Sequence, residues 1–189
     1  TVNSNPSSNF FYKILYTILH RPSFKLISER LLNRRKRNNI VKEIQSYFPK
    51  NIFSGLFIHV DHHLAHLSST FHVSPFENAS ILSVDGFGDF ASTMWGRGNK
   101  NKITIKKRVL FPHSLGIFYQ ALTQFLGFPN YGDEYKVMGL APYGKPNFLK
   151  EMRKIVQLKH KDFFRLNLEY FIFHKKDFKN NWDNGSPVF

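Results

Sequence analysis

Two short motifs hold the residues best able to do chemistry in this chain of 189 residues. His62 and His66 are four positions apart in HVDHHLAH, so a helix would stack both imidazoles on one face, within reach of one metal ion. Asp85 follows an apolar segment in ILSVDGFGD, within a glycine-bracketed turn. Such a carboxylate can complete a metal site, and the amides of such a turn can meet a phosphate. These residues are the candidate ligands of a metal centre.

Each motif also has an interpretation that needs no metal. Nine histidines in 189 residues give about 0.4 pairs at a spacing of four by chance, and such residues can simply line a core or cap a helix. An Asp-Gly pair after a strand is most often an ordinary hairpin turn. The residues alone therefore leave both interpretations open.

A third motif, NYGDEYKVMGLAPYGKP, covers residues 130–146. Its glycines permit close backbone approach, an acidic side chain such as Glu134 could bind ribose hydroxyls, and Lys136 could meet a phosphate. The alternative is a proline-ended loop with a surface ion pair.

The spacing of apolar residues predicts the helix that would position the two histidines. Asp61 can cap a helix over residues 62–71, which carries both of them. Further helical stretches are expected over residues 10–48, divided at Pro22 and ended by Pro49, over residues 115–126 between Ser114 and Gly127, and near residues 148–158.

Short apolar runs predict the strands that would position the carboxylate of Asp85. We expect a strand over residues 79–84, a turn over residues 85–89 and a returning strand over residues 91–95. Other strands are expected over residues 57–60 and over residues 103–111, the latter more exposed and with basic residues on one side. The carboxylate of Asp85 would then lie in a hairpin turn.

The net charge of +14 is concentrated on the flanks of the chain. Residues 1–50 carry ten basic and two acidic residues, and residues 146–189 carry nine and five, but residues 51–145 carry eight and six. The aromatic segment over residues 163–173 could stack bases, although its apolar residues favour a core role. The motif-bearing part is therefore not expected to bind nucleic acid.

The chain contains no cysteine, which excludes disulfides and thiolate ligands and favours a cytoplasmic setting. No apolar run approaches the roughly 18 residues of a membrane span, so no membrane partner is expected.

Taken in order, four motifs resemble one protein family. HHLAHLSSTF, SVDGFGD, HSLGIFYQALTQFLGF and DEYKVMGLAPYGKP are similar to the N-terminal domain of the nodulation-protein-type O-carbamoyltransferases, over roughly residues 50–175. That domain is similar to the tRNA threonylcarbamoyladenosine synthases. The resemblance implies an α/β fold of the actin/Hsp70/sugar-kinase class, with a mixed sheet, a β-hairpin phosphate loop and flanking helices. We expect a disordered start over residues 1–9, a partial domain over 10–175 and a tail over 176–189.

The resemblance implies a two-step chemistry. A C-terminal YrdC-like domain would make carbamoyl adenylate from carbamoyl phosphate and ATP, and the present domain would transfer the carbamoyl group to a hydroxyl of an aminoglycoside, an oligosaccharide or another acceptor. His62 and His66 match the metal-binding histidines, and Asp85 matches the carboxylate ligand. The metal, iron or zinc, would hold the phosphate of the adenylate.

Other site residues follow from the same resemblance. Gly86 and Gly88 would bring amides towards that phosphate, and Glu134 and Lys136 match a turn near the nucleotide. Of the two neighbouring histidines, His63 or His59, one would either support a ligand or act as the base for the acceptor hydroxyl. We assign His63 as the candidate catalytic residue.

The chain begins with Thr1 and is expected to be a fragment. The family's opening strand pair, the second half of its fold with a further aspartate ligand, and the adenylate-forming domain are all missing. The fragment should therefore be inactive alone and one ligand short. Two other classes stay open: a metal-dependent hydrolase that uses the same His/His/Asp trio without ATP, and a basic nucleic-acid-binding module.

Overall fold

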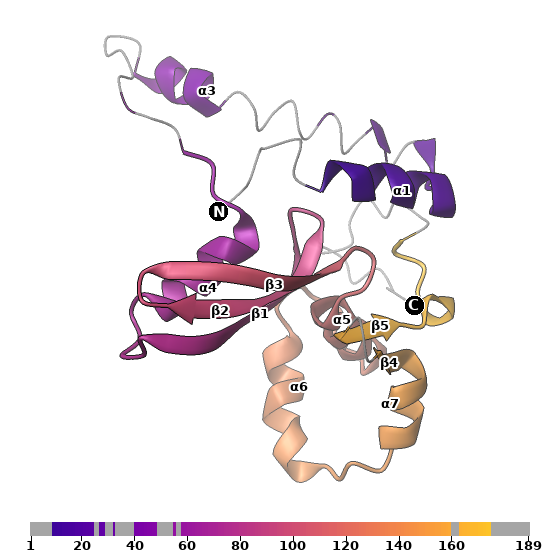
Figure 1. Cartoon of the computed structure of the whole chain (residues 1–189). Helices are drawn as coiled ribbons and strands as arrows, with labels where there is room; N and C mark the ends of the chain where they lie inside the picture. Colours follow the sequence, from indigo (N-terminus) through magenta and orange to yellow (C-terminus); the bar gives the residue numbers. More distant parts are fainter. Residues whose placement is uncertain are drawn as a thin grey trace.

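The computed structural model describes residues 9–24, 27–28, 32, 40–48, 55, 58–159 and 163–174. Within these residues, helices and two antiparallel sheets alternate along the chain (Figure 1). The helices are α1 (Phe10–His20), α3 (Ile40–Tyr47), α4 (His62–Phe71), α5 (Leu115–Phe125), α6 (Glu134–Leu140) and α7 (Leu149–Ile155), with single 3-10 turns at Ala141–Tyr143 and Leu168–Tyr170. The strands are β1 (Asn78–Gly88), β2 (Ala91–Asn99), β3 (Lys102–Leu110), β4 (Val156–Lys159) and β5 (Phe163–Leu166).

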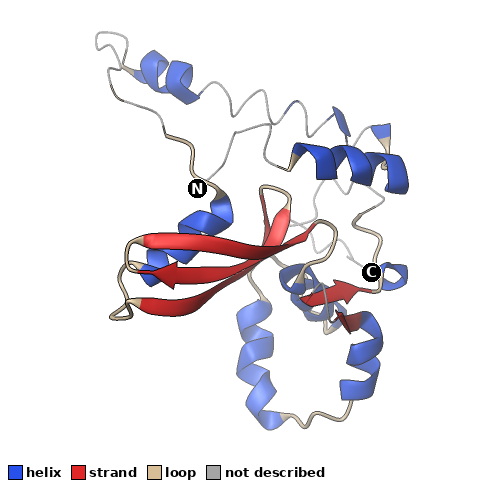
Figure 2. Ribbon diagram, in the orientation of Figure 1, coloured by secondary structure: helices blue, strands red, loops and turns tan. Residues whose placement is uncertain are grey.

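The larger sheet has the order β1-β2-β3, and α4 covers one of its faces (Figure 2). Along β1, Ile81 and Ser83 are buried whereas Leu82 and Val84 are exposed, as expected for a strand with one covered face. Leu67 and Phe71 of α4 pack on Ile81 and on Met94 of β2. This small core fixes the helix that carries the two histidines over the strand that carries Asp85.

A second core joins distant parts of the chain. It consists of the buried residues Tyr16, Phe111, Ile117, Ala121, Ile155, Leu166, Phe171 and Phe173. Phe171 and Phe173 belong to the aromatic segment over residues 163–173, so the core interpretation of that segment is confirmed. The Tyr16 hydroxyl donates to the carbonyl of His174, which attaches α1 to this core.

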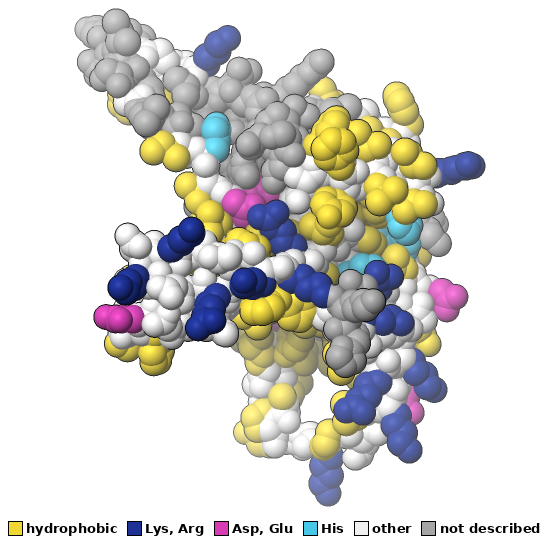
Figure 3. Space-filling view, in the orientation of Figure 1, with side chains coloured by type: hydrophobic (Ala, Val, Ile, Leu, Met, Phe, Trp, Pro, Cys, Tyr) yellow, Lys and Arg dark blue, Asp and Glu magenta, His cyan; other side chains and the backbone are white. Residues whose placement is uncertain are grey.

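Several predicted elements are confirmed. The helix over residues 62–71 has the predicted bounds, and α5 follows Ser114 and precedes Gly127, which has a φ of 91°. The third strand is exposed at alternate positions, and lysines and arginines gather over the β2–β3 hairpin (Figure 3). These cations discourage other strands from pairing with the β3 edge.

Other predictions need correction. Both sheets of the described residues are antiparallel, so the mixed sheet is not seen in them; an α/β composition with a small antiparallel sheet is what the structure has. Residues 58–60 are not a strand, because they are exposed and pair with no neighbour in the described sheets, and Phe57 lies outside the described residues. Asn9 is placed, and its Nδ2 donates to the carbonyl of Asp89. Residues 1–8 and 176–189 lie outside the described residues.

The predicted turn over residues 85–89 is also wrong. β1 continues through Asp85 to Gly88, with an irregular register between Val84 and Gly88, and the turn itself is Asp89-Phe90. Both turn residues have positive φ values, 53° and 70°. Asp85 therefore projects from an irregular part of a strand rather than from a loop tip.

Candidate metal centre

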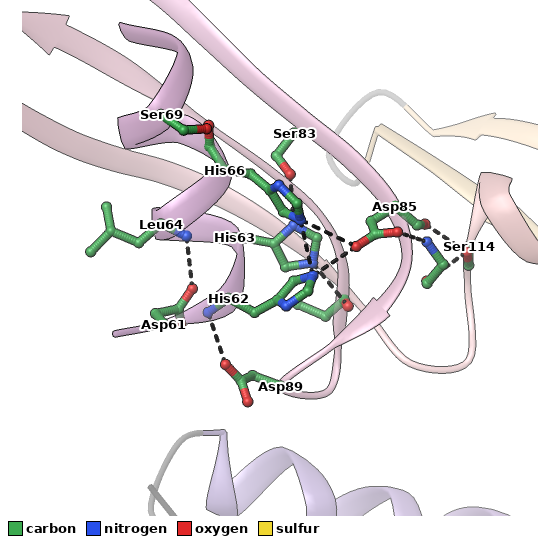
Figure 4. Close-up of polar contacts among 12 residues, drawn as sticks. Asp61, His62, His63, Leu64, His66, Ser69, Ser83, Asp85, Asp89 and Ser114 are labelled. Carbon is green, nitrogen blue, oxygen red and sulfur yellow. Dashed lines mark hydrogen bonds and ion pairs between the residues drawn. The ribbon is translucent and has the colours of Figure 1, made fainter. Parts of the chain in front are cut away.

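The start of α4 sets the first two candidate ligands. The Asp61 carboxylate accepts from the backbone N–H of Leu64 at 3.0 Å, which caps the helix as predicted. His62 and His66 then lie one turn apart on the same face, with their Nε2 atoms 3.1 Å from each other (Figure 4). The helix thus aims two equivalent nitrogen atoms at one point.

β1 brings the third candidate ligand to the same point. Asp85 Oδ2 lies 2.7 Å from His62 Nε2 and 3.4 Å from His66 Nε2. Ligands about 2.1 Å from a tetrahedral zinc ion lie about 3.4 Å apart, so these separations are close to what one shared ion requires. Two imidazoles and a carboxylate suit zinc or iron, and the three residues therefore fit a metal of that kind.

The charge of Asp85 suits this role. Burial would raise the pKa of its carboxyl, but hydrogen bonds from the His62 ring and the Gly86 amide, together with the nearby imidazoles, outweigh burial and lower that pKa below its usual 3.8. Asp85 is therefore ionised at neutral pH, as a metal ligand must be.

The two glycines of the motif have different surroundings. A Cβ at Gly88 would overlap the ring of His62, so the imidazole packs directly on the bare backbone there. A Cβ at Gly86 would meet nothing within 4 Å, and the Gly86 amide donates to Asp85 Oδ1 at 2.6 Å. Gly88 makes room for a candidate ligand, and Gly86 orients one.

Ser114 is a site residue that the sequence analysis did not assign to the centre. Its buried hydroxyl lies 3.0 Å from the Asp85 carbonyl and 2.8 Å from the Gly86 carbonyl, and it also accepts from the Ile117 amide at the start of α5. Gly116 of α5 packs against the same Asp85–Gly86 backbone. The only sequence signal was that a serine begins a helix, which says nothing about where that helix docks.

The His63 ring packs edge-on against the rings of His62 and His66, with ring centres 5.3 Å and 6.2 Å apart, but its nitrogen atoms bind partners in the core. Its ring is fully buried, Nε2 lies 3.0 Å from the carbonyl of Ala91, and Nδ1 lies 2.9 Å from the hydroxyl of Ser83. Because a carbonyl can only accept, Nε2 carries the proton and Nδ1 accepts from Ser83. Burial lowers the pKa of this imidazole, so it is neutral at physiological pH. A catalytic base must reach its substrate. The buried environment of His63 instead matches the alternative in which this residue supports a metal ligand.

Glu134 and Lys136 lie on α6 and do not belong to this cluster. Lys136 Nζ is 2.7 Å from Asp133 Oδ1 and 5.7 Å from the centre of the Phe128 ring. The hydrogen bond from Lys136 lowers the pKa of Asp133, and the same contact raises the pKa of Lys136. The ion pair expected if this segment has no nucleotide role is thus present. Contact of Glu134 and Lys136 with a nucleotide stays a prediction.

Comparison with known proteins identifies the domain. The family model described as "Carbamoyltransferase N-terminus" matches residues 11–181. The chain belongs to this family.

Curated relatives of this carbamoyltransferase family member include two nodulation proteins. The chain is 47% identical over 89 residues to nodulation protein NolNO of Sinorhizobium fredii and 42% identical over 95 residues to nodulation protein NolO of Bradyrhizobium diazoefficiens. It is 43% identical over 112 residues to the uncharacterized protein sll1178 of Synechocystis. The matches cover 46%, 49% and 59% of this chain but only 13%, 17% and 18% of the respective relatives. The chain therefore spans less than a fifth of these relatives.

Within the described part of this carbamoyltransferase domain, no helix has the length and apolar character needed to cross a membrane.

The buried His63 makes the domain sensitive to acid in its metal-free form. Its pKa is lower in the folded than in the unfolded chain, so between those two values only the unfolded chain binds the proton. We expect stability to be complete above about pH 6.5 and to fall as the pH drops through the lowered pKa, by at most about 1.4 kcal/mol per pH unit from this group. Urea unfolding of the wild type and of His63→Gln between pH 8 and pH 5 measures this effect.

The His63→Gln curve should be flatter, because glutamine cannot take up the proton. Ser83→Ala is the matched control: it removes one partner of the ring at 2.9 Å but leaves the imidazole in place. This control should be less stable by about 1 kcal/mol at every pH and should keep the wild-type slope. Equal slopes for His63→Gln and the wild type would contradict the assignment.

Proposed function

We propose that this domain takes part in carbamoyl transfer from carbamoyl adenylate to a hydroxyl of an acceptor. The observation that carries the proposal is the convergence of His62, His66 and Asp85, whose ligand atoms all lie within 4.8 Å of one another, in a member of the carbamoyltransferase family. The acceptor that we propose is a small molecule or an oligosaccharide in a biosynthetic pathway, and the setting is the cytoplasm.

The three residues would hold iron or zinc. When bound, that ion would supply Lewis-acid stabilisation of the adenylate phosphate as the carbamoyl group leaves. The ionised Asp85 would offset part of the positive charge of the ion, and the Nε2 atoms of His62 and His66 would supply two nitrogen ligands. A further ligand would come from the part of the fold that the relatives have beyond this chain.

The surrounding residues would keep these ligands in place. Ser114 holds the backbone of Asp85 and the Gly86 amide holds its carboxylate. His63 attaches α4 to β1 through Ser83. We assign His63 a positioning role in place of the catalytic one. Glu134 and Lys136 are proposed to face the nucleotide from the start of α6, where the contact with Asp133 orients the lysine.

The larger assembly is also part of the proposal. The domain would belong to the actin/Hsp70/sugar-kinase class, with β1 and β2 forming its phosphate hairpin. A YrdC-like domain elsewhere in the complete protein would form carbamoyl adenylate from ATP and carbamoyl phosphate.

The test is a transfer assay on the complete protein with radiolabelled carbamoyl phosphate, ATP and a panel of aminoglycosides and oligosaccharides. Pyrophosphate release reports adenylate formation, and label on the acceptor reports transfer. His66→Ala should retain pyrophosphate release and lose at least about 100-fold in transfer. The matched control is His72→Ala, at the exposed C-terminal end of the same helix, which should transfer normally. Undiminished transfer by His66→Ala would remove the metal from the mechanism, and hydrolysis without ATP would favour the hydrolase.

A further inference from the structure

The carboxylate of Asp89 points to the start of α4 rather than to solvent (Figure 4). Its Oδ2 accepts from the backbone N–H of His62 at 2.9 Å, across 27 positions of sequence. That amide is one of the N-terminal N–H groups for which a helix has no internal partner. Asp89 therefore supplies a cap from another element.

Two carboxylates thus share the start of α4, and they do different things. Asp61 accepts from the amide of Leu64 at 3.0 Å within the segment that leads into the helix, and its Oδ2 lies 3.9 Å from the guanidinium of Arg108 on β3, at the limit of an ion pair. Asp89 belongs to the β1–β2 turn, so its bond ties the helix to the hairpin. Because His62 begins that helix and Asp85 lies on that hairpin, the bond sets the separation of two candidate ligands.

The backbone of the turn supports a special role for Asp89. Its φ of 53° and the φ of 70° at Phe90 lie in the left-handed region, which glycine would occupy more easily. Aspartate tolerates this region better than most residues but still less well than glycine. The contact with His62 gives a physical reason for a carboxylate at a position where glycine would be less strained.

The turn is also held from its other side. Asn9 Nδ2 donates to the Asp89 carbonyl at 2.8 Å, and the Phe90 ring lies 5.9 Å from that of Tyr16 of α1. The neighbouring Gly88 has no side chain, which leaves room for the His62 ring. The backbone and ring of His62 are thus both fixed by one short segment, residues 88–89.

We infer that Asp89 is a positioning residue for His62 and not a metal ligand. It lies outside the trio whose ligand atoms converge, and it acts on the metal through the backbone of His62. This inference rests on the metal site of the proposed function. Loss of a group that orients a ligand usually weakens metal affinity by about 10- to 100-fold.

The experiment titrates the chain with Zn²⁺ by calorimetry and with Co²⁺ by absorption spectroscopy, and measures amide exchange at His62 without metal. Asp89→Gly removes the carboxylate and relieves the backbone. We expect about 10- to 100-fold weaker Zn²⁺ binding, shifted Co²⁺ bands and faster exchange of the His62 amide. Asp89→Asn keeps an acceptor oxygen, so its Zn²⁺ affinity, Co²⁺ bands and His62 amide exchange should all lie closer to those of the wild type.

Asp61→Ala separates positioning from simple fraying of the helix. It removes the local cap and the 3.9 Å contact with Arg108, and it should cost about 1 kcal/mol of stability, with Zn²⁺ affinity closer to the wild type than that of Asp89→Gly. Equal weakening in the two variants would assign the effect to fraying and overturn the inference. So would wild-type affinity, spectrum and exchange in Asp89→Gly. Absence of Zn²⁺ and Co²⁺ binding by the wild type, with faster exchange in Asp89→Gly, would instead remove the proposed metal site and leave Asp89 as a structural cap.

Discussion

Asp85→Asn is expected to lose metal binding while the domain stays folded. Asparagine has nearly the same shape but no charge, and Oδ2 of Asp85 lies 2.7 Å from His62 Nε2 and 3.4 Å from His66 Nε2. An amide oxygen is a poor ligand for zinc, which is bound by histidine, cysteine and carboxylate groups. We expect Zn²⁺ affinity to fall by at least about 100-fold in calorimetry.

The metal-free variant should remain close to the wild type in stability. The side chain of Asp85 is 39% exposed, and a polar contact as accessible as this contributes at most about 1 kcal/mol. The matched control is Asp133→Asn, which removes another carboxylate of lowered pKa and the charge of its ion pair with Lys136. That control should bind Zn²⁺ as the wild type does. Equal affinity in Asp85→Asn and the wild type would exclude Asp85 as a ligand.

Gly88→Ala should damage the same centre without changing any ligand. A Cβ at this position overlaps the His62 ring, so either the imidazole must leave its place or β1 must move. Overpacking of this kind costs about 1–3 kcal/mol. Because His62 would move away from Asp85 and His66, we expect a loss of about 100-fold in Zn²⁺ affinity as well.

The same hairpin offers the control. Gly86→Ala adds the same methyl group two residues away, where nothing lies within 4 Å of the new atom. Zn²⁺ affinity should then change by less than about threefold, a difference worth roughly 0.7 kcal/mol. If Gly86→Ala and Gly88→Ala weakened Zn²⁺ binding equally, the cause would be the reduced conformational freedom of the hairpin backbone and not a displacement of the His62 ring.

The sequence was sufficient for features that local signals specify. Asp61 next to an apolar helical pattern predicted α4 with its correct ends, and Ser114 and Gly127 did the same for α5. A helix then determines that His62 and His66 share a face, whatever surrounds it. The ILSVDGFGD motif offered Asp85 as a third candidate and the family resemblance supported it, and the structure brings its carboxylate to both histidines.

Contacts between distant segments could not be predicted in this way. Ser83 meets His63, Asp89 meets His62 and Ser114 meets the Asp85–Gly86 backbone, and each contact depends on how a helix docks on the sheet. The histidine pattern alone also could not show that His63 points into the core. The strand predicted over residues 57–60 failed for a similar reason, because a strand needs a partner that composition does not reveal.

The hydrogen bond between Tyr16 and His174 spans 158 positions of the chain, whereas the bond between His62 and Asp89 spans 27 and the bond between Ser114 and Gly86 spans 28. Closing a long loop is slow relative to closing a short one, so these bonds should form at different stages of folding. During synthesis, which proceeds from the N-terminus, residues 61–114 can assemble the ligand cluster before His174 exists. Helix α1 can pack on Phe90 and Phe111 through Tyr16 at that stage, but its hydrogen bond to His174 forms only later, so the attachment of this helix is completed in two steps.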